Sequence, residues 1–376
     1  MKKLNFWEAV STIVGTIVGA GILGIPYVVA QAGFFTGLLM MLVLGLSLMV
    51  VNLFIGEIIL RTKGKFQLPG YAEKYLGVWG KRFMTLSMGA GIYGALIAYI
   101  IGVGVVLQAL FSGSNFFYSL LFFIVFSVIL YFGIKLVKVF ELIMSFALFT
   151  VVVLIVIFSA PAIEASHFLY FDLSKIFLPY GVVLFAFLGA SAIYQAREIL
   201  QKDTKQLKKA IIIASLVPIF LYVLFTFVVL GVTGINTTEI ATVGLGNYLG
   251  MKMNLFGNLF SFFAMGTGFL SLGLAMTQIY NYDYKINKIF SWILAIGIPF
   301  IIFLIGARDF ITTLGLVGAV AGGFEGILLI IMYFKARKKG NRKPEYSFSP
   351  FFCKVMGSVI ILLYAFGLIY TLWSMV

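Results

Sequence analysis

Long apolar runs recur from one end of this chain to the other, and each is long enough to cross a hydrocarbon core of ~30 Å. Of the 376 residues, 62% are hydrophobic and only 11% are charged. Backbone groups inside a bilayer must be hydrogen-bonded within the protein, which restricts spanning segments to helices and closed barrels. A barrel would show short alternating segments instead of long apolar runs. We therefore predict an all-α integral membrane protein.

The apolar runs predict eleven transmembrane helices. Their expected ranges are 6–31, 34–60, 83–110, 115–134, 137–160, 173–199, 208–232, 255–281, 287–306, 310–334 and 352–375. The segment at 61–82 mixes charges with Leu68, Pro69, Tyr71 and Tyr75, which indicates a short interfacial helix. The outer segment at 233–254 is rich in Gly, Thr and Asn, and it is a candidate for part of an outer lid.

Basic residues predict the orientation, because cytoplasmic loops carry an excess of Lys and Arg. With a cytoplasmic N-terminus, only three of the 27 basic residues fall outside: Lys175, Lys252 and Arg308. This placement accounts for the net charge of +14 without a nucleic-acid partner. An odd number of spans puts the C-terminus on the extracytoplasmic side. The expected partners are the lipid bilayer and a small solute, with no obligate protein partner evident.

The first predicted span is interrupted by glycine and proline. Gly15, Gly19, Gly21 and Gly24 are followed by Pro26, although glycine is costly in a helix and proline removes an internal hydrogen bond. Freed backbone groups are tolerated at membrane depth only where they are buried in protein or line a cavity. The interruption therefore predicts a broken helix that offers N–H and C=O groups to a small polar solute.

A second interruption lies in the sixth span, at Phe185–Ala192, five spans after the first. Two broken segments in corresponding halves point to an inverted repeat with its site at the membrane midplane. We predict a first repeat of five helices over 1–160, a second over 173–334, and an additional eleventh helix over 352–376. Five spans per repeat give the halves opposite topology.

Several other classes of protein are disfavoured. A single Cys (Cys353) excludes an intramolecular disulfide, and with one His (His167, in an outer loop) the common His/Cys metal sites are absent. An intramembrane aspartyl protease needs two Asp within spans, whereas Asp283 and Asp309 are expected near opposite faces. We therefore expect no enzyme and no cofactor.

The interrupted first helix resembles that of the amino acid–polyamine–organocation transporter superfamily, which has the LeuT-type fold. The closest likeness is to the amino acid/auxin permease branch and the aromatic (tryptophan/tyrosine) amino acid permeases. The residues that carry it are Gly19–Pro26, Gly56-Glu57-Ile58-Ile59-Leu60-Arg61, Leu178-Pro179, Ile193–Arg197, Lys208–Ile211 with Pro218, and Thr267–Leu270. In place of the Phe-Gly-Phe-His-like run of the aromatic permeases, this chain has Phe187-Leu188-Gly189-Ala190. Where many members of the superfamily carry an acid, it has Ser191, which argues against a dedicated cationic substrate.

The positive end of a half-helix favours an anion, so the N–H groups of Ala20, Gly21 and Ile22 are expected to face a substrate carboxylate. The C=O groups of Phe185, Ala186 and Leu188 are expected to accept from a substrate ammonium, with Ser191 adding a hydroxyl. The resemblance places Tyr99 beside the substrate, and Phe187 is a candidate gate. The competing interpretations are a small-residue packing seam at the first break and a simple kink at the second.

Two coupling ions remain open, and uncoupled exchange is the third possibility. The resemblance implies a sodium ion bound by the carbonyls of Gly15, Val18 and Ala264 and the hydroxyl of Thr267. However, Gly268 stands where a second hydroxyl is expected. The alternative is a proton on Glu325, which we expect inside the membrane, where an ionisable group is a functional candidate by default.

The resulting hypothesis is a secondary active transporter. It would import a neutral, bulky apolar or aromatic L-amino acid by alternating access, coupled to H⁺ or Na⁺. The short termini favour a prokaryotic plasma membrane. Other solutes (a polyamine or a nucleobase-like compound), a channel and a non-transporting amino acid receptor are the alternatives.

Overall fold

A computed structural model describes residues 2–64, 66–132, 150–200 and 203–373. Within these ranges the secondary structure is helical, apart from one isolated bridge between Gly33 and Phe171. Eight helices are long and apolar enough to cross a membrane, and a bent pair of helices adds a ninth span to this described part. The expectation of an all-helical multi-pass protein is therefore confirmed.

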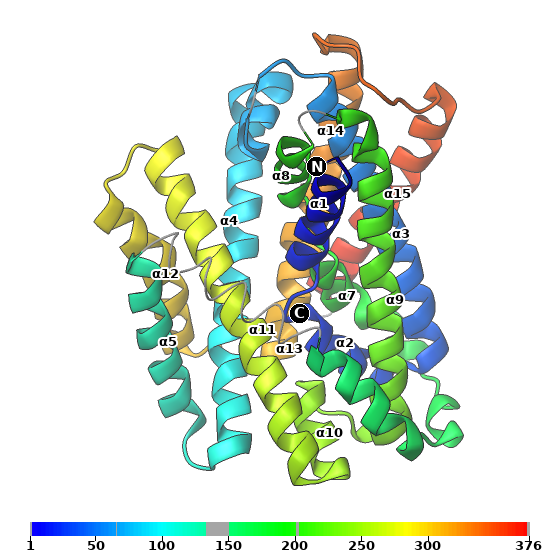
Figure 1. Ribbon diagram of the computed structural model, residues 1–376, viewed down its shortest axis with the longest axis vertical. Helices are drawn as coiled ribbons and strands as arrows, with labels where there is room; N and C mark the ends of the chain where they lie inside the picture. Colours follow the sequence, from blue (N-terminus) through cyan, green and yellow to red (C-terminus); the bar gives the residue numbers. More distant parts are fainter. Residues whose placement is uncertain (1, 65, 133–149, 201–202, 374–376) are drawn as a thin grey trace.

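The first half contains a broken span and three long helices (Figure 1). The helices are α1 (Lys2–Ile17), α2 (Gly21–Ala32), α3 (Phe34–Leu60), α4 (Leu68–Phe111) and α5 (Asn115–Phe132). The predicted interfacial helix is the first part of α4, and Gly77, with a φ of +80°, separates it from the span proper. A left-handed φ of this kind is open to glycine at no steric cost.

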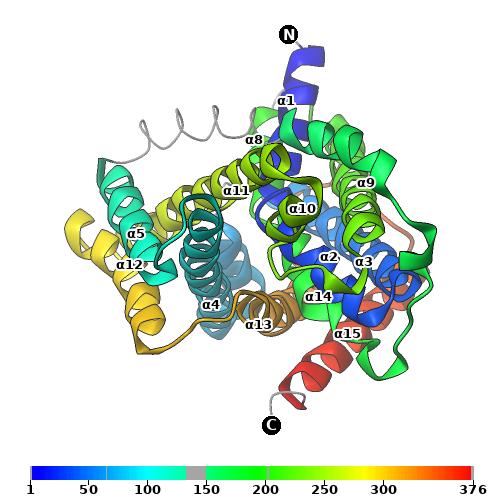
Figure 2. The same ribbon diagram turned by 90° about the horizontal axis from the view of Figure 1, so that it is seen from below.

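The second half starts with two short helices and continues with long ones. The helices are α7 (Pro179–Ala186), α8 (Ala192–Ile199), α9 (Leu207–Thr233), α10 (Ala241–Leu249), α11 (Met251–Gln278), α12 (Lys288–Ile305), α13 (Phe310–Leu316), α14 (Gly323–Lys339) and α15 (Pro350–Trp373). The chain also contains two described π-helical segments. η6 (Ile279–Asp283) follows α11, and η7 (Val317–Gly322) joins α13 to α14. In Figures 1 and 2, α5 and α12 lie at one edge of the bundle and α3, α9 and α15 at the other.

The predicted count of eleven spans is not confirmed. The expected fifth span, 137–160, begins outside the described residues, and a short apolar helix covers Thr150–Ala162. The expected sixth span is divided between α7 and α8, which have eight residues each and are too short to cross a membrane alone. The 5 + 5 inverted repeat and the orientation of the termini stay predictions.

The broken spans run in opposite directions through the centre of the bundle. α1 packs against α8 and α9, whereas α2 packs against α7 and α9. The first broken span runs from α1 to α2. The second runs from α7, which lies beside α2, to α8, which lies beside α1 (Figure 1). Each half-helix is paired with the opposite half of the other span, which brings the two breaks to the same depth.

The additional helix α15 is tied to the core by polar contacts. Glu57 of α3 is fully buried, and its carboxylate accepts hydrogen bonds from Arg61 (2.8 Å), Tyr333 (2.8 Å) and Ser347 (3.0 Å). The Tyr333 hydroxyl also lies 3.1 Å from the Cys353 thiol at the start of α15. A buried carboxylate needs such partners, because desolvation without them is expensive.

The segment 233–254, which is a candidate for part of an outer lid, contains the short helix α10, and α10 packs against α2, α9 and α11. In the loop before it, the Glu239 carboxylate accepts a hydrogen bond from the N–H of Phe310 and faces Asp309, at the start of α13. Burial, and after it the nearby Asp309, raises the pKa of Glu239 above its ordinary value. This segment therefore meets α13 through a contact that favours a protonated carboxyl group.

We expect Glu239→Gln to increase stability only at high pH. A raised pKa means that the folded state binds the proton more tightly, so the contribution of Glu239 is present at low pH and is lost as the pH rises through the folded-state pKa. The difference in Tm between the variant and the wild type in detergent should therefore be near zero at about pH 4 and positive at about pH 8.

The matched control, Asp172→Asn, should change Tm in the opposite direction. Hydrogen bonding to Ser174 lowers the pKa of Asp172, so Asp172→Asn should lower Tm at high pH and have no effect at low pH. A constant Tm difference for Glu239→Gln across this range would contradict the assignment.

Candidate functional site

The two breaks touch each other. A Cβ built on Gly21, the first residue of α2, would lie 2.6 Å from the Cα of Ala186, the last residue of α7. A Cβ built on Gly189 would overlap the side chain of Ile17, the last residue of α1. Only glycine permits these two approaches, so the interruptions predicted from the sequence form one junction inside the protein.

The first break exposes backbone donors. Among the described residues, the N–H groups of Ala20 and Gly21 have no hydrogen-bond partner, whereas those of Ile22 and Leu23 bond back to Gly19 and Ala20. Both unpartnered groups lie at the N-terminal end of α2, where the helix dipole is positive. Ala20 and Ile22 are buried, so water cannot readily compete for this position. The arrangement suits an anionic group such as a carboxylate, as the sequence predicted for the N–H groups of Ala20 and Gly21.

The second break offers fewer acceptors than predicted. The Phe185 carbonyl accepts the N–H of Leu188 (3.1 Å), and the Ala186 carbonyl accepts a hydroxyl from α9 (2.9 Å). The Leu188 carbonyl has no partner in the described part of the chain. Of the three predicted ammonium acceptors, Leu188 is therefore the one whose carbonyl is wholly available. Ser191 lies at the start of α8, where its hydroxyl bonds with that of Tyr194.

Tyr222 of α9 joins the breaks, and the sequence reasoning missed it. Its hydroxyl lies 2.8 Å from the carbonyl oxygen of Ile17 and 2.9 Å from that of Ala186, the final residues of α1 and α7. The N–H of Gly19 also donates to it. Tyr222 is fully buried. Its only signal in the sequence is its position four residues after Pro218, which does not single it out among 19 tyrosines.

Two predicted aromatic residues border this junction. The ring of Phe187 lies 4.9 Å from that of Tyr222, centroid to centroid, and Tyr99 of α4 is near enough to interact with the Tyr222 hydroxyl. The ring of Tyr99 packs on Gly268 of α11, where a Cβ would lie 2.6 Å from it. The glycine found in place of a second hydroxyl thus makes room for Tyr99. The structure brings Tyr99 and Phe187 together, and their roles in substrate contact stay predictions.

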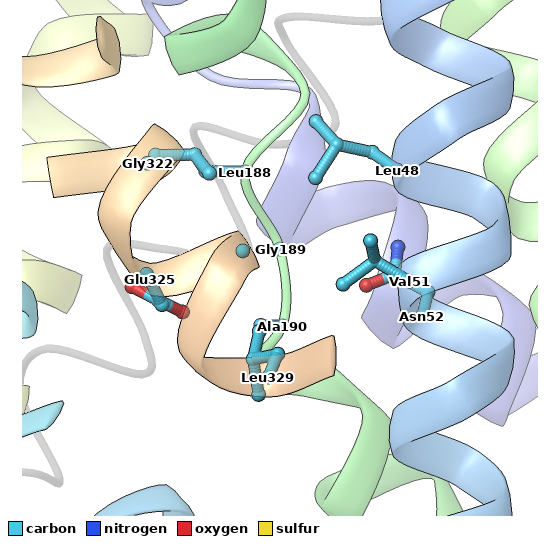
Figure 3. A pocket seen from close by; sticks show the side chains of 10 residues that line it. Leu48, Val51, Asn52, Leu188, Gly189, Ala190, Gly322, Glu325 and Leu329 are labelled. Atoms are coloured by element: carbon cyan, nitrogen blue, oxygen red, sulfur yellow. The ribbon is translucent and has the colours of Figure 1, made fainter. Parts of the chain in front are cut away.

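A small, mainly apolar cavity adjoins the second break (Figure 3). It offers about 10 Å³ to the centre of a water molecule, which is room for about one water. Its polar side chains are Asn52 of α3 and Glu325 of α14, on opposite sides of the Gly189–Ala190 backbone. The lining residues are Leu48, Val51, Asn52, Leu188, Gly189, Ala190, Gly322, Glu325, Gly326 and Leu329.

Glu325 follows directly on an irregular part of its span. The π-helical segment η7 ends at Gly322, and π-helical turns inside helices are frequently found at functional sites. Tyr194 of α8 lies close enough to interact electrostatically with the Glu325 carboxylate. The predicted intramembrane acid therefore lies near α3, α8 and the second break.

The predicted sodium site stays a prediction. The Thr267 hydroxyl donates to the carbonyl of Phe263 in its own helix (2.6 Å). A Cβ on Gly15 would meet nothing within 4 Å, so the space beside this glycine is open. A hard cation bound by Gly15, Val18, Ala264 and Thr267 would need several of their oxygens within 2.3–2.6 Å.

The two halves of the first broken span differ in accessibility. Ten of the 12 residues of α2 are buried. In contrast, α1 exposes Glu8, Ser11, Gly15 and Thr16, which recur at helical spacing along one face. A polar face on a membrane half-helix is stable where it lines an aqueous path. The α2 half is therefore enclosed by the bundle, whereas one face of the α1 half is exposed.

Comparison with known proteins places the chain among amino acid carriers. The model of the tryptophan/tyrosine permease family matches residues 2–374. "Glutamine transporter 2" of Aliivibrio fischeri is 23% identical over 86% of this chain and 87% of its own length. "Tyrosine-specific transport system 1" of Haemophilus influenzae is 23% identical over 88% of each chain. "Vacuolar amino acid transporter 2" of Saccharomyces cerevisiae is 32% identical over 30% of this chain and 24% of its own length.

We expect Gly21→Ala to destabilise the junction, because its Cβ would press on the backbone of Ala186 and overpacking costs about 1–3 kcal/mol. The measurement is the Tm of the purified protein in detergent, which should fall by several degrees. Gly15→Ala is the matched control in the same span. It adds a methyl group in open space and improves helix propensity by up to about 1 kcal/mol, so its Tm should equal or exceed that of the wild type. Equal Tm values for Gly21→Ala and the wild type would show that the breaks are not in contact.

Proposed function

Since the chain belongs to the tryptophan/tyrosine permease family, we propose that it is a secondary transporter of a neutral L-amino acid, with its substrate site at the junction of the two breaks. The observation that carries the proposal is the contact between the breaks, with unpartnered backbone donors on one and an unpartnered carbonyl on the other. A zwitterion requires both kinds of group, away from competing water. Family membership excludes an enzyme.

The proposed binding mode has two polar ends and one apolar side. The N–H groups of Ala20 and Gly21 bind the carboxylate, and the Leu188 carbonyl with the Ser191 hydroxyl binds the ammonium group. Tyr99 and Phe187 lie beside the junction and present aromatic surface to the side chain, which favours an apolar or aromatic substrate. Gly189 gives no support to a bulky substrate, because Ile17 occupies the space beside it.

The LeuT-type fold and membership of the wider amino acid–polyamine–organocation superfamily are part of the proposal. They are supported by the paired, oppositely directed broken spans and by an acid at the end of α3 that is bound to Arg61. Alternating access then requires the α1 side to close and the α2 side to open around the junction. Because the relatives named for glutamine and tyrosine transport are equally similar to this chain, both substrates need to be tested.

The test is uptake into proteoliposomes that contain the purified protein. Radiolabelled tyrosine, tryptophan, leucine and glutamine are offered in separate assays, with spermidine and uracil as the other classes of solute. We expect uptake and counterflow of at least one neutral amino acid, with aromatic substrates competing best. Uptake of only spermidine or uracil would overturn the substrate class. Binding of an amino acid without counterflow would identify a receptor rather than a transporter.

For coupling, we propose that Glu325 carries a proton during transport. The support is its position in the cavity beside the second break. A neutral Glu325 removes a negative charge next to the Gly189–Ala190 backbone and thereby changes which arrangement of the break is favoured. The proton would enter with the substrate and leave on the opposite side.

We expect Glu325→Gln to lose proton-driven accumulation and to retain counterflow, because glutamine imitates the protonated carboxyl and cannot release a proton. With an imposed gradient of one pH unit, a 1:1 symporter accumulates substrate about tenfold, since 1.4 kcal/mol corresponds to a factor of ten. The variant should show no accumulation.

Glu164→Gln serves as the control, because Glu164 is exposed in the loop before α7 and should leave accumulation unchanged. Wild-type accumulation by Glu325→Gln would remove Glu325 from the coupling mechanism. Accumulation driven by a sodium gradient alone would favour the site at Thr267.

A further inference from the structure

Tyr222 is the single side chain in the described part of the structure whose hydroxyl contacts the last carbonyl of both interrupted half-helices. The last C=O groups of a helix lack partners within that helix. At the depth of the junction water cannot supply them, so both carbonyls depend on a side chain from elsewhere. One hydroxyl on α9 meets this need for α1 and α7 at once.

The position of the hydroxyl is fixed from three sides. Phe187 packs on the Tyr222 ring, the N–H of Gly19 donates to the hydroxyl oxygen, and the two carbonyls receive its proton. A phenolic hydroxyl has one proton, so the two carbonyls share it or compete for it. The bond can therefore strengthen toward one half-helix as it weakens toward the other.

The helix that carries Tyr222 has a weak point one turn earlier. Pro218 lies inside α9 and cannot donate the backbone hydrogen bond of a normal helix. A proline inside a helix is a common cause of a kink. α9 packs against α1, α2 and α3, so the helix that carries Pro218 and Tyr222 adjoins both parts of the first broken span.

We propose that Tyr222 is a positioning residue that holds the two breaks in register, so that the donors of Ala20 and Gly21 face the acceptor of Leu188 across one ligand. The proposal rests on the proposed function for its ligand. It adds a specific device, in which the hydroxyl sets the separation of α1 from α7 and thus the shape of the site. Tyr222 is assigned no contact with the substrate.

The test compares Tyr222→Phe with Tyr180→Phe. Tyr180 of α7 is equally buried, and its hydroxyl also donates to a main-chain carbonyl, that of Tyr364, 3.3 Å away and outside the junction. Both variants lose one buried hydroxyl together with its hydrogen bonding to main-chain carbonyl oxygen, so both should lower Tm. Substrate Kd is then measured with the radiolabelled amino acid that the wild type transports.

We expect the Kd of Tyr222→Phe to rise at least tenfold and that of Tyr180→Phe to stay within twofold of the wild type. The conservative change keeps the ring and its contact with Phe187, which separates the role of the hydroxyl from that of aromatic packing. Equal Kd values for the two variants would overturn the proposal, because Tyr222 would then contribute to stability alone.

A second readout does not need a substrate. Thr16 is exposed on α1, one residue before the carbonyl that Tyr222 binds, and the natural Cys353 is buried. Thr16→Cys is alkylated with a membrane-impermeant maleimide in the wild-type, Tyr222→Phe and Tyr180→Phe backgrounds. Release of α1 should change the alkylation rate at least threefold in the Tyr222→Phe background alone. If the wild type carries no amino acid, the proposed function fails, and this rate still decides the role of Tyr222. Identical rates in all three backgrounds would overturn that role.

Discussion

A peptide group inside a bilayer must find a hydrogen-bond partner within the protein, and this constraint governs the centre of the molecule. Each of the two interrupted spans frees donors at the start of one half-helix and acceptors at the end of another. The protein itself supplies hydrogen-bond partners for some of these groups. The Tyr222 hydroxyl donates to the carbonyls of Ile17 and Ala186. It leaves the N–H groups of Ala20 and Gly21 and the Leu188 carbonyl without partners among the described residues. Groups that are buried and unpaired in this way are costly, and a bound zwitterion would satisfy them.

Close packing of backbone on backbone makes this arrangement possible. Gly21 lies against Ala186, and further along α7, Gly181 lies against the π-helical segment that precedes Glu325. Through these contacts the first break, the second break and the acid-bearing span form a continuous packed unit. A change in the charge of Glu325 or in the position of α1 therefore acts on neighbours that have little room to adjust, and interfaces of this kind tend to switch between discrete arrangements.

Much of the candidate site could be predicted from the sequence because glycine and proline act locally. Each break was predicted from its own residues, whereas the roles of Tyr99, Phe187 and Glu325 stay predictions. Other inferences depended on what lies across the bundle. Gly268, which stands where a second hydroxyl is expected, faces the Tyr99 ring, and Gly189 accommodates Ile17. Glu57 is fully buried and binds three partners, and two of them, Tyr333 and Ser347, come from segments nearly 300 residues away.

The sequence by itself determined the class of the protein, the location of both interruptions and membership of an amino acid permease family, since hydrophobic length and backbone-breaking residues have the same consequence in any helical membrane protein. Only the tertiary structure decided that the breaks meet, which backbone groups remain available, and that Tyr222 joins them. The physical reason is that a hydrogen bond to a helix end depends on direction and on distances of about 3 Å. Among 19 tyrosines, the packing of α9 against both breaks selects the one that reaches them.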